Sequence, residues 1–199
     1  MVAVPALAAD VARPSDEQRM VVHASWKQYA ILRELLDDSP GLRMTYRTGV
    51  LELMSSAPSH ELWKTNIARL VELYAYVRGI DLRGYGSTTF KHEAKQRGVE
   101  PDECYLLGKS LADYPEMVLE VIYTVPLVDK LEIYADMGIA EVWTYRDRAF
   151  RIHALSGARY ELRERSQFLP DLDFALVARY VERSDTLAAL REFEAALGR

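Results

Sequence analysis

The chain has 199 residues, which is enough for one domain with a full hydrophobic core. Hydrophobic residues make up 49% of it and charged residues 28%, the balance of a soluble globular protein, and no apolar run approaches the roughly 18 residues that a membrane span needs. The net charge of −5 argues against non-specific binding of duplex DNA over the whole surface, so any contact with nucleic acid is expected to use a local patch.

Residues 1–20 begin with an Ala-rich stretch that Pro5 and Asp10 interrupt, and no basic segment precedes its apolar residues. This pattern predicts a flexible leader rather than a signal peptide. We expect the remaining residues, 21–199, to form a single domain without a membrane partner.

In the first half of that domain, proline and glycine residues mark the ends of the predicted elements. Apolar residues at helical spacing predict a helix that follows the leader and stops at residues 39–41. Residues 43–55 alternate in polarity around Thr48-Gly49, which predicts a β-hairpin with glycine in its turn. Pro58 begins a long amphipathic helix that ends at Gly79.

Short strands are predicted next, at 81–93, at 101–108 and at 115–124, with a polar loop between the last two. Residues 125–139 have a helical pattern, with Pro126 in the first turn and Gly138 at the end.

Residues 140–145 and 149–155 are predicted to form a hairpin, and 160–174 a strand followed by a turn. Two helices close the chain at 176–182 and 184–198, the last one capped by Ser184. The order of elements predicts α/β architecture, a central mixed β-sheet flanked by helices, with C-terminal helices.

Glu120 stands in the apolar run Met117-Val118-Leu119-Glu120-Val121-Ile122, which has the length and β-branched content of a strand buried on both faces. An ionised carboxylate there is costly unless a cation, a metal ion or several donors meet it. The sequence therefore raises the question of which residues meet Glu120.

Asp102 and Lys130 are the nearest candidates. Asp102 precedes a short strand that can pair with the strand of Glu120, and two carboxylates at one end of a sheet suit Mg²⁺ or Mn²⁺. Lys130 lies early on the following helix, from which its ammonium can reach the acids and stabilise a phosphoryl transition state. A structural Glu120–Lys130 ion pair without any chemistry explains the same residues equally well. Asp129 is predicted to cap the helix rather than to act in catalysis.

His60 and Glu52 are further candidates. His60 lies near the start of a helix, where the dipole disfavours its cation, so it suits a neutral ligand or base; a surface histidine is the alternative. Glu52 lies on a hairpin strand, and its alternation places it equally well near the acids or in solvent. The one cysteine, Cys104, is predicted to be a small buried residue, and it fits a reducing, cytoplasmic compartment.

A basic segment lies just before Asp102. Lys91, Lys95 and Arg97 are three of its cations, and they could contact phosphates beside a metal ion, although a solvated loop explains them as well.

Several segments resemble the Uma-two family of restriction endonucleases, in the PD-(D/E)XK nuclease superfamily. They are Pro101-Asp102, PEMVLEV at 115–121 and, most specifically, DKLEIYADMGIAEVW at 129–143. The residues GVLELMS at 49–55 and the pair His60-Glu61 also match. The similarity extends from about residue 23 to about residue 195.

This resemblance implies a restriction-endonuclease-like core, a divalent metal at Asp102 and Glu120, and Lys130 as the catalytic lysine. The strict motif places that lysine two residues after the acid, where this chain has Ile122. The lysine of this chain lies on the next helix instead.

Two functions remain open at this point. One is a metal-dependent endonuclease acting on DNA, with His60 or Glu52 completing the site. The other is a catalytically inactive protein of the same fold that binds nucleic acid or protein. A homodimer is expected by analogy with enzymes that cut both strands.

Overall fold

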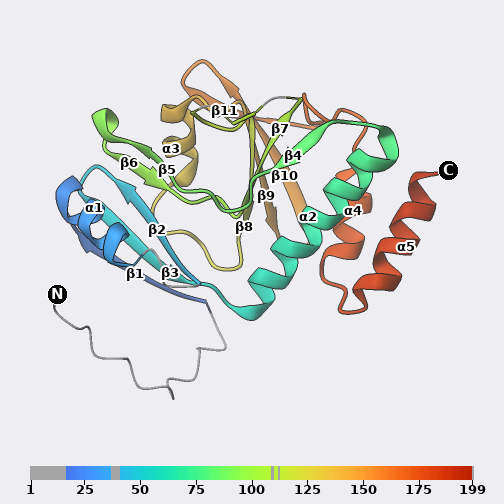
Figure 1. The fold of residues 1–199 in the computed structure, drawn as a ribbon, viewed down its shortest axis with the longest axis horizontal. Coiled ribbons are helices and arrows are strands. Elements are labelled where there is room, and N and C mark those ends of the chain that lie inside the picture. The colour runs from blue at the N-terminus through green and yellow to red at the C-terminus, as the bar shows by residue number, and fades with distance from the viewer. Residues whose placement is uncertain (1–16, 37–40, 109, 112, 199) are drawn as a thin grey trace.

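The computed structural model describes residues 17–36, 41–108, 110–111 and 113–198, which form two β-sheets covered by helices (Figure 1). A five-stranded antiparallel sheet has the order β1-β3-β2-β6-β5. Its strands, in that order, are Gln18–His23, Val50–Ser55, Leu42–Arg47, Arg97–Val99 and Phe90–His92.

A six-stranded mixed sheet lies at the centre of the molecule, in the order β11-β10-β9-β8-β7-β4. Its strands, in that order, are Arg159–Arg163, Ala149–Ser156, Glu141–Arg146, Met117–Val121, Glu103–Leu107 and Leu82–Gly84. Only the pair β8–β9 is parallel among these described strands. The mixed sheet and its helices confirm the predicted α/β class.

Helices cover both faces of the six-stranded sheet. On one face lie α2 (Pro58–Arg78), α4 (Phe174–Val181) and α5 (Thr186–Leu197). On the other lies α3 (Lys130–Met137), the crossover between β8 and β9, which packs together with residues of β5 and β6. A further α-helix, α1 (Trp26–Leu35), covers the five-stranded sheet, and a short 3-10 helix, Glu93–Lys95, connects β5 to β6.

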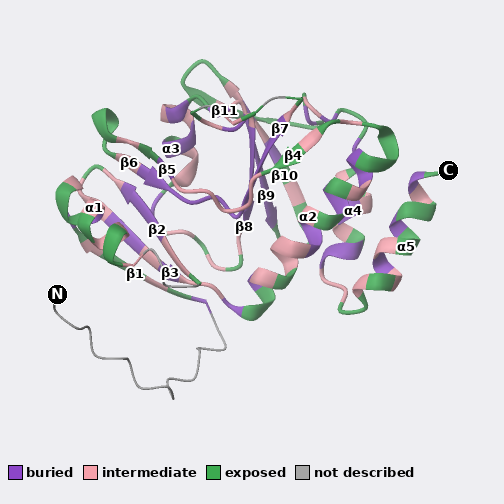
Figure 2. Ribbon diagram, viewed as in Figure 1, coloured by how far each residue is buried: buried purple, intermediate pink, exposed green. Residues whose placement is uncertain are grey.

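Strand β8 is the centre of the buried layer (Figure 2). All five of its residues are buried, and successive side chains point to opposite faces of the sheet. Leu119 and Val121 join the core under α2, whereas Val118 joins the core under α3. Glu120 therefore points to the α3 side, as the apolar run around it predicted for a strand buried on both faces.

The predicted hairpin turn and both predicted ends of α2 are confirmed. The hairpin turns at Thr48-Gly49, and α2 begins at Pro58. Gly79 ends α2 in the left-handed conformation, with φ of 66°, which glycine adopts without steric cost.

Some predicted boundaries are wrong. β1 begins at Gln18, inside the predicted leader 1–20, because it pairs with β3; residues 1–16 lie outside the described part of the chain. Helix α1 ends at Leu35, before the predicted stop at 39–41, and residues 37–40 are likewise not described. Strand β6 was not predicted.

The helices of the second half also begin at other residues than predicted, and α4 begins at Phe174, two residues before the predicted 176. α3 starts at Lys130 rather than near Pro126, and the Oδ1 atom of Asp129 caps it by accepting from the Leu131 amide at 2.9 Å. Asp185 rather than Ser184 is the N-cap residue of α5. Within the described ranges, no helix is both long and apolar enough to cross a membrane.

Gly98 on β6 provides a test of this packing. A Cβ atom at this position would collide with the ring and hydroxyl of Tyr29, a fully buried residue that stacks on Tyr46 with ring centroids 4.9 Å apart. We expect Gly98→Ala to lower the free energy of unfolding by about 1–3 kcal/mol, because overpacked cores strain their neighbours. Chemical denaturation measures the change.

The matched control is the same substitution in a Tyr29→Ala background. There the added methyl group meets an open space, so its cost should shrink to a fraction of the value in the wild-type background. An equal cost in both backgrounds would contradict the assigned contact.

Candidate active site

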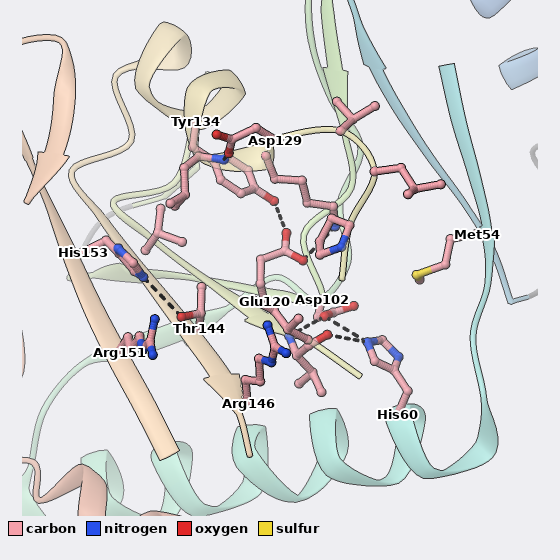
Figure 3. A pocket seen from close by; sticks show the side chains of 18 of the residues that line it. Met54, His60, Asp102, Glu120, Asp129, Tyr134, Thr144, Arg146, Arg151 and His153 are labelled. Atoms are coloured by element: carbon pink, nitrogen blue, oxygen red, sulfur yellow. Dashed lines mark hydrogen bonds and ion pairs between the residues drawn. The ribbon is translucent and has the colours of Figure 1, made fainter. Parts of the chain in front are cut away.

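A cavity of about 800 Å³ opens on the α3 side of the six-stranded sheet (Figure 3). Its walls come from the end of β8, the loop that follows, the start of α3 and the hairpin β9–β10. Asp102, Glu120, Lys130 and His60 all line it. Four of the predicted site residues therefore meet in one place.

Asp102 lies immediately before β7 and is fixed by backbone pairing with β8. Its amide donates to the Leu119 carbonyl at 3.2 Å, and its Oδ2 atom accepts from the Val121 amide at 2.7 Å. The antiparallel register pairs Glu103 with Leu119, so Asp102 lies opposite Glu120. This is the pairing that the sequence predicted.

Glu120 is met by two donors from α3. Its Oε2 atom lies 2.7 Å from Lys130 Nζ, and its Oε1 atom accepts from the Tyr134 hydroxyl. Lys130 and Tyr134 are one helical turn apart, so they present both donors on one face of α3. The lysine also donates to the Glu100 carbonyl at 3.3 Å.

His60 is buried at the start of α2, which corrects the alternative of a surface histidine. Its Nε2 atom lies 3.2 Å from Asp102 Oδ2 and 3.1 Å from the Val121 carbonyl oxygen. A carbonyl oxygen only accepts hydrogen bonds, so Nε2 carries a proton. The other ring nitrogen, Nδ1, lies 3.8 Å from Glu61 Oε1.

The environment shifts the ionisation of these groups in different directions. Burial opposes a charge on His60, but the Asp102 carboxylate and its hydrogen bond outweigh burial and raise the pKa of His60 to about 10. The ring is therefore charged at neutral pH, which corrects the expectation of a neutral ligand or base. Burial also opposes ionisation of Asp102, yet the charges of His60 and Lys130 lower its pKa.

Burial raises the pKa of Glu120, and the Lys130 ammonium offsets this only in part. For Lys130, burial disfavours the charge, but the carboxylates of Glu120 and Asp102 raise its pKa, so it is charged at neutral pH. The site thus contains one strongly acidic carboxyl, Asp102, and one weakly acidic carboxyl, Glu120, whose pKa values lie apart.

Glu52 is buried but does not line the cavity. Its Oε1 atom lies 2.5 Å from Arg19 Nη1, and its Oε2 atom accepts from the amides of Leu127 and Val128. These contacts hold the loop between β8 and α3, which explains why α3 begins only at Lys130.

The predicted phosphate-contacting cations lie elsewhere. Lys91 is exposed on β5, and none of Lys91, Lys95 and Arg97 lines the cavity. The side chains of Lys95 and Arg97 lie 3.6 and 2.7 Å from the carboxylate of Asp136 on α3. Their charges are therefore engaged on the outer side of that helix.

The sequence reasoning missed the residues that β9 and β10 contribute to the cavity. They are Val142, Thr144, Arg146, Ala149, Arg151 and His153. The signal that could have found them is strand register, because Glu120 pairs with Thr144 and Thr144 pairs with Arg151.

The donor set suits a hard cation. Two carboxylates, from Asp102 and Glu120, share the cavity, and the carbonyl of Val121 lies beside Asp102. In the described part of the chain, no group of three or more His, Cys, Asp or Glu side chains is arranged to hold a metal. Mg²⁺ and Mn²⁺ accept one or two carboxylates together with water and substrate oxygens, so the residues present fit such an ion.

The two sheets with their helices constitute a restriction-endonuclease-like fold, and the site lies where its central strand ends. A family model described as "Uma2: Putative restriction endonuclease" matches residues 26–181. The chain belongs to this family, which connects it with nuclease function. A search of curated proteins found no match.

The imidazole of His60 provides a pH-dependent test. Its pKa in the folded chain, about 10, is above the unfolded value of about 6.5. The stabilisation it contributes is therefore complete below about pH 6.5 and is lost as the pH rises towards 10. We expect the unfolding free energy of the wild type to fall over this window relative to that of His60→Gln.

Nuclear magnetic resonance of the His60 ring checks the cause directly. In Asp102→Asn the ring loses its charged partner while burial remains, so its pKa should drop below that of the wild type. An unchanged titration would show that Asp102 does not hold the proton.

Glu52 can be tested as a structural residue. Glu52→Ala leaves the Arg19 guanidinium, whose side chain is 9% exposed, without one of its two carboxylate partners. We expect a loss of about 3 kcal/mol in the free energy of unfolding. Glu34→Ala, at an exposed position of α1, should stay within about 0.5 kcal/mol of the wild type. Equal stability of the two variants would contradict the assigned role.

Proposed function

We propose that this protein is an endonuclease that hydrolyses phosphodiester bonds of DNA with Mg²⁺ or Mn²⁺ held by Asp102 and Glu120. The observation that carries the proposal is the meeting of two acids and a lysine in one cavity of a chain from a nuclease family. In this proposal Lys130 and His60 act beside the acids, and Glu52 holds the loop that precedes α3.

The ion, when bound, would polarise a phosphate oxygen and lower the pKa of a water molecule. Asp102 has a lowered pKa and is ionised at neutral pH, so its carboxylate is ready to accept a cation. Glu120 has a raised pKa, which suits it to take a proton from a water molecule as well as to hold the ion.

Lys130 supplies positive charge from the helix instead of from the strand. Its Nζ atom lies 2.7 Å from Glu120 Oε2, so it can stabilise charge that develops on a phosphate next to the acids. His60 donates from Nε2 to Asp102 Oδ2 and fixes the rotamer of that carboxylate. Tyr134 does the same for Glu120.

A second candidate function is a nuclease-fold protein that binds without cutting. The observation that favours it is that the protein itself already satisfies the acids. Both oxygens of Glu120 are engaged, by Lys130 and Tyr134, and Asp102 Oδ2 is engaged by His60 and the Val121 amide. Acids whose oxygens accept from donors of the protein itself are stable without a metal ion.

Cleavage of plasmid DNA tests the first candidate. We expect the wild type to nick or linearise plasmid with Mn²⁺ or Mg²⁺, and Asp102→Asn to have no detectable activity. Lys130→Met should cut about 100- to 1,000-fold more slowly, the usual cost of losing one preorganised charge stabiliser.

The matched control is Glu161→Gln, an exposed carboxylate of β11 outside the cavity, which should cut like the wild type. Equal cutting by the wild type and Asp102→Asn would identify a contaminating nuclease and remove the proposal.

Calorimetry with Mn²⁺ separates the two candidates without a substrate. A metal-dependent enzyme should give a binding isotherm that Glu120→Gln weakens strongly. Absence of heat with the wild type would support the non-cutting alternative, because a structural ion pair does not require a divalent ion. Sedimentation of the same samples tests the homodimer that is expected by analogy.

A further inference from the structure

The hairpin β9–β10 forms the wall of the cavity that faces the acids (Figure 3). Glu120 is paired with Thr144 on β9, and Thr144 is paired with Arg151 on β10. Directly paired residues lie on the same face of a sheet, so Arg151 lies on the face of Glu120, two strands or roughly 10 Å away. Arg146, two residues after Thr144, shares this face.

The two arginines have charges that the protein does not neutralise strongly. Arg151 is exposed, and no hydrogen bond or ion pair joins its guanidinium to another of the described residues. Arg146 lies 3.2 Å from Asp147, but their side chains are 53% and 86% exposed. Exposed pairs of this kind contribute little and exchange readily with other partners.

His153 lies on the same face of β10 as Arg151, two residues further along the strand (Figure 3). Its Nε2 atom lies 3.2 Å from the Thr144 hydroxyl, and burial together with the Arg151 charge lowers its pKa. The ring is therefore neutral at neutral pH, so the charges of this wall are those of the two arginines and of Asp147, which also lines the cavity beside Arg146. The opposite side of the cavity carries the carboxylates of Asp102 and Glu120.

We propose that Arg146 and Arg151 form a phosphate-binding wall that holds the DNA backbone next to the phosphodiester facing Glu120. Guanidinium groups bind phosphate oxygens in bidentate fashion, and an acidic chain needs a local patch of this kind to approach DNA. This assignment replaces the segment of Lys91, Lys95 and Arg97, which lies outside the cavity. It rests on the proposed function for its choice of ligand.

Fluorescence anisotropy with a labelled DNA duplex of about 20 base pairs, in EDTA so that binding is read without cleavage, tests the wall. The full chain with Arg146→Gln and Arg151→Gln together should bind at least about tenfold more weakly than the wild type. The slope of log K against log salt should also become shallower by about 2, because two phosphate contacts are lost.

Two double variants with the same change of charge serve as controls. Arg179→Gln with Arg191→Gln changes exposed residues of α4 and α5, on the opposite face of the sheet, and should bind like the wild type. Lys91→Gln with Lys95→Gln should also leave the salt slope unchanged. Thermal unfolding of each variant checks that the fold is intact, which exposed substitutions preserve.

The outcomes separate this proposal from the endonuclease itself. Weaker binding by the wall variant, in a protein that never cuts DNA, supports the wall and refutes the enzyme. If the protein cuts DNA and the wall variant keeps the affinity and salt slope of the wild type, the wall is refuted and the endonuclease is not. A wild type that binds no DNA, or an equal loss in the control on α4 and α5, also overturns the wall.

Discussion

The architecture depends on how one carboxylate is neutralised inside an apolar sheet. Every residue of β8 is buried, so an unpaired charge on Glu120 would be strongly destabilising. Both of its donors, Lys130 and Tyr134, come from α3, so the ion pair fixes that helix over the strand. Because α3 is also the crossover from β8 to β9, the same interaction supports the parallel pairing that builds the cavity.

The sequence predicted those elements whose signals are local. The turn at Thr48-Gly49 and the helix from Pro58 to Gly79 are encoded by neighbouring residues, and both are present. Strand β1 could not be predicted in this way, because it exists only through pairing with β3, more than two dozen residues away. The start of α3 was missed for a similar reason: a helical pattern ahead of it is overridden by backbone bonds to Glu52.

The candidate site likewise contains residues that the sequence predicted and residues that it did not. The order of an acid, a second acid in a buried strand and a lysine was sufficient to predict that Asp102, Glu120 and Lys130 meet. Arg146 and Arg151 were not predicted, because their position follows from the sheet order β8-β9-β10 and not from any spacing along the chain. The acids are buried and these arginines are exposed, so an acidic protein still presents positive charge beside the acids of its cavity.

The loop before α3 is held by contacts between residues that lie far apart in the sequence. Arg19 donates to the Thr124 hydroxyl across 105 positions of sequence, and Glu17 accepts from the Thr124 amide across 107. Contacts of such long range close late in folding, because the chain entropy of a large loop must be lost first. The loop that borders the cavity consequently takes its place only when the N-terminal strand is paired, whereas Glu120 and Lys130, 10 positions apart, can meet earlier.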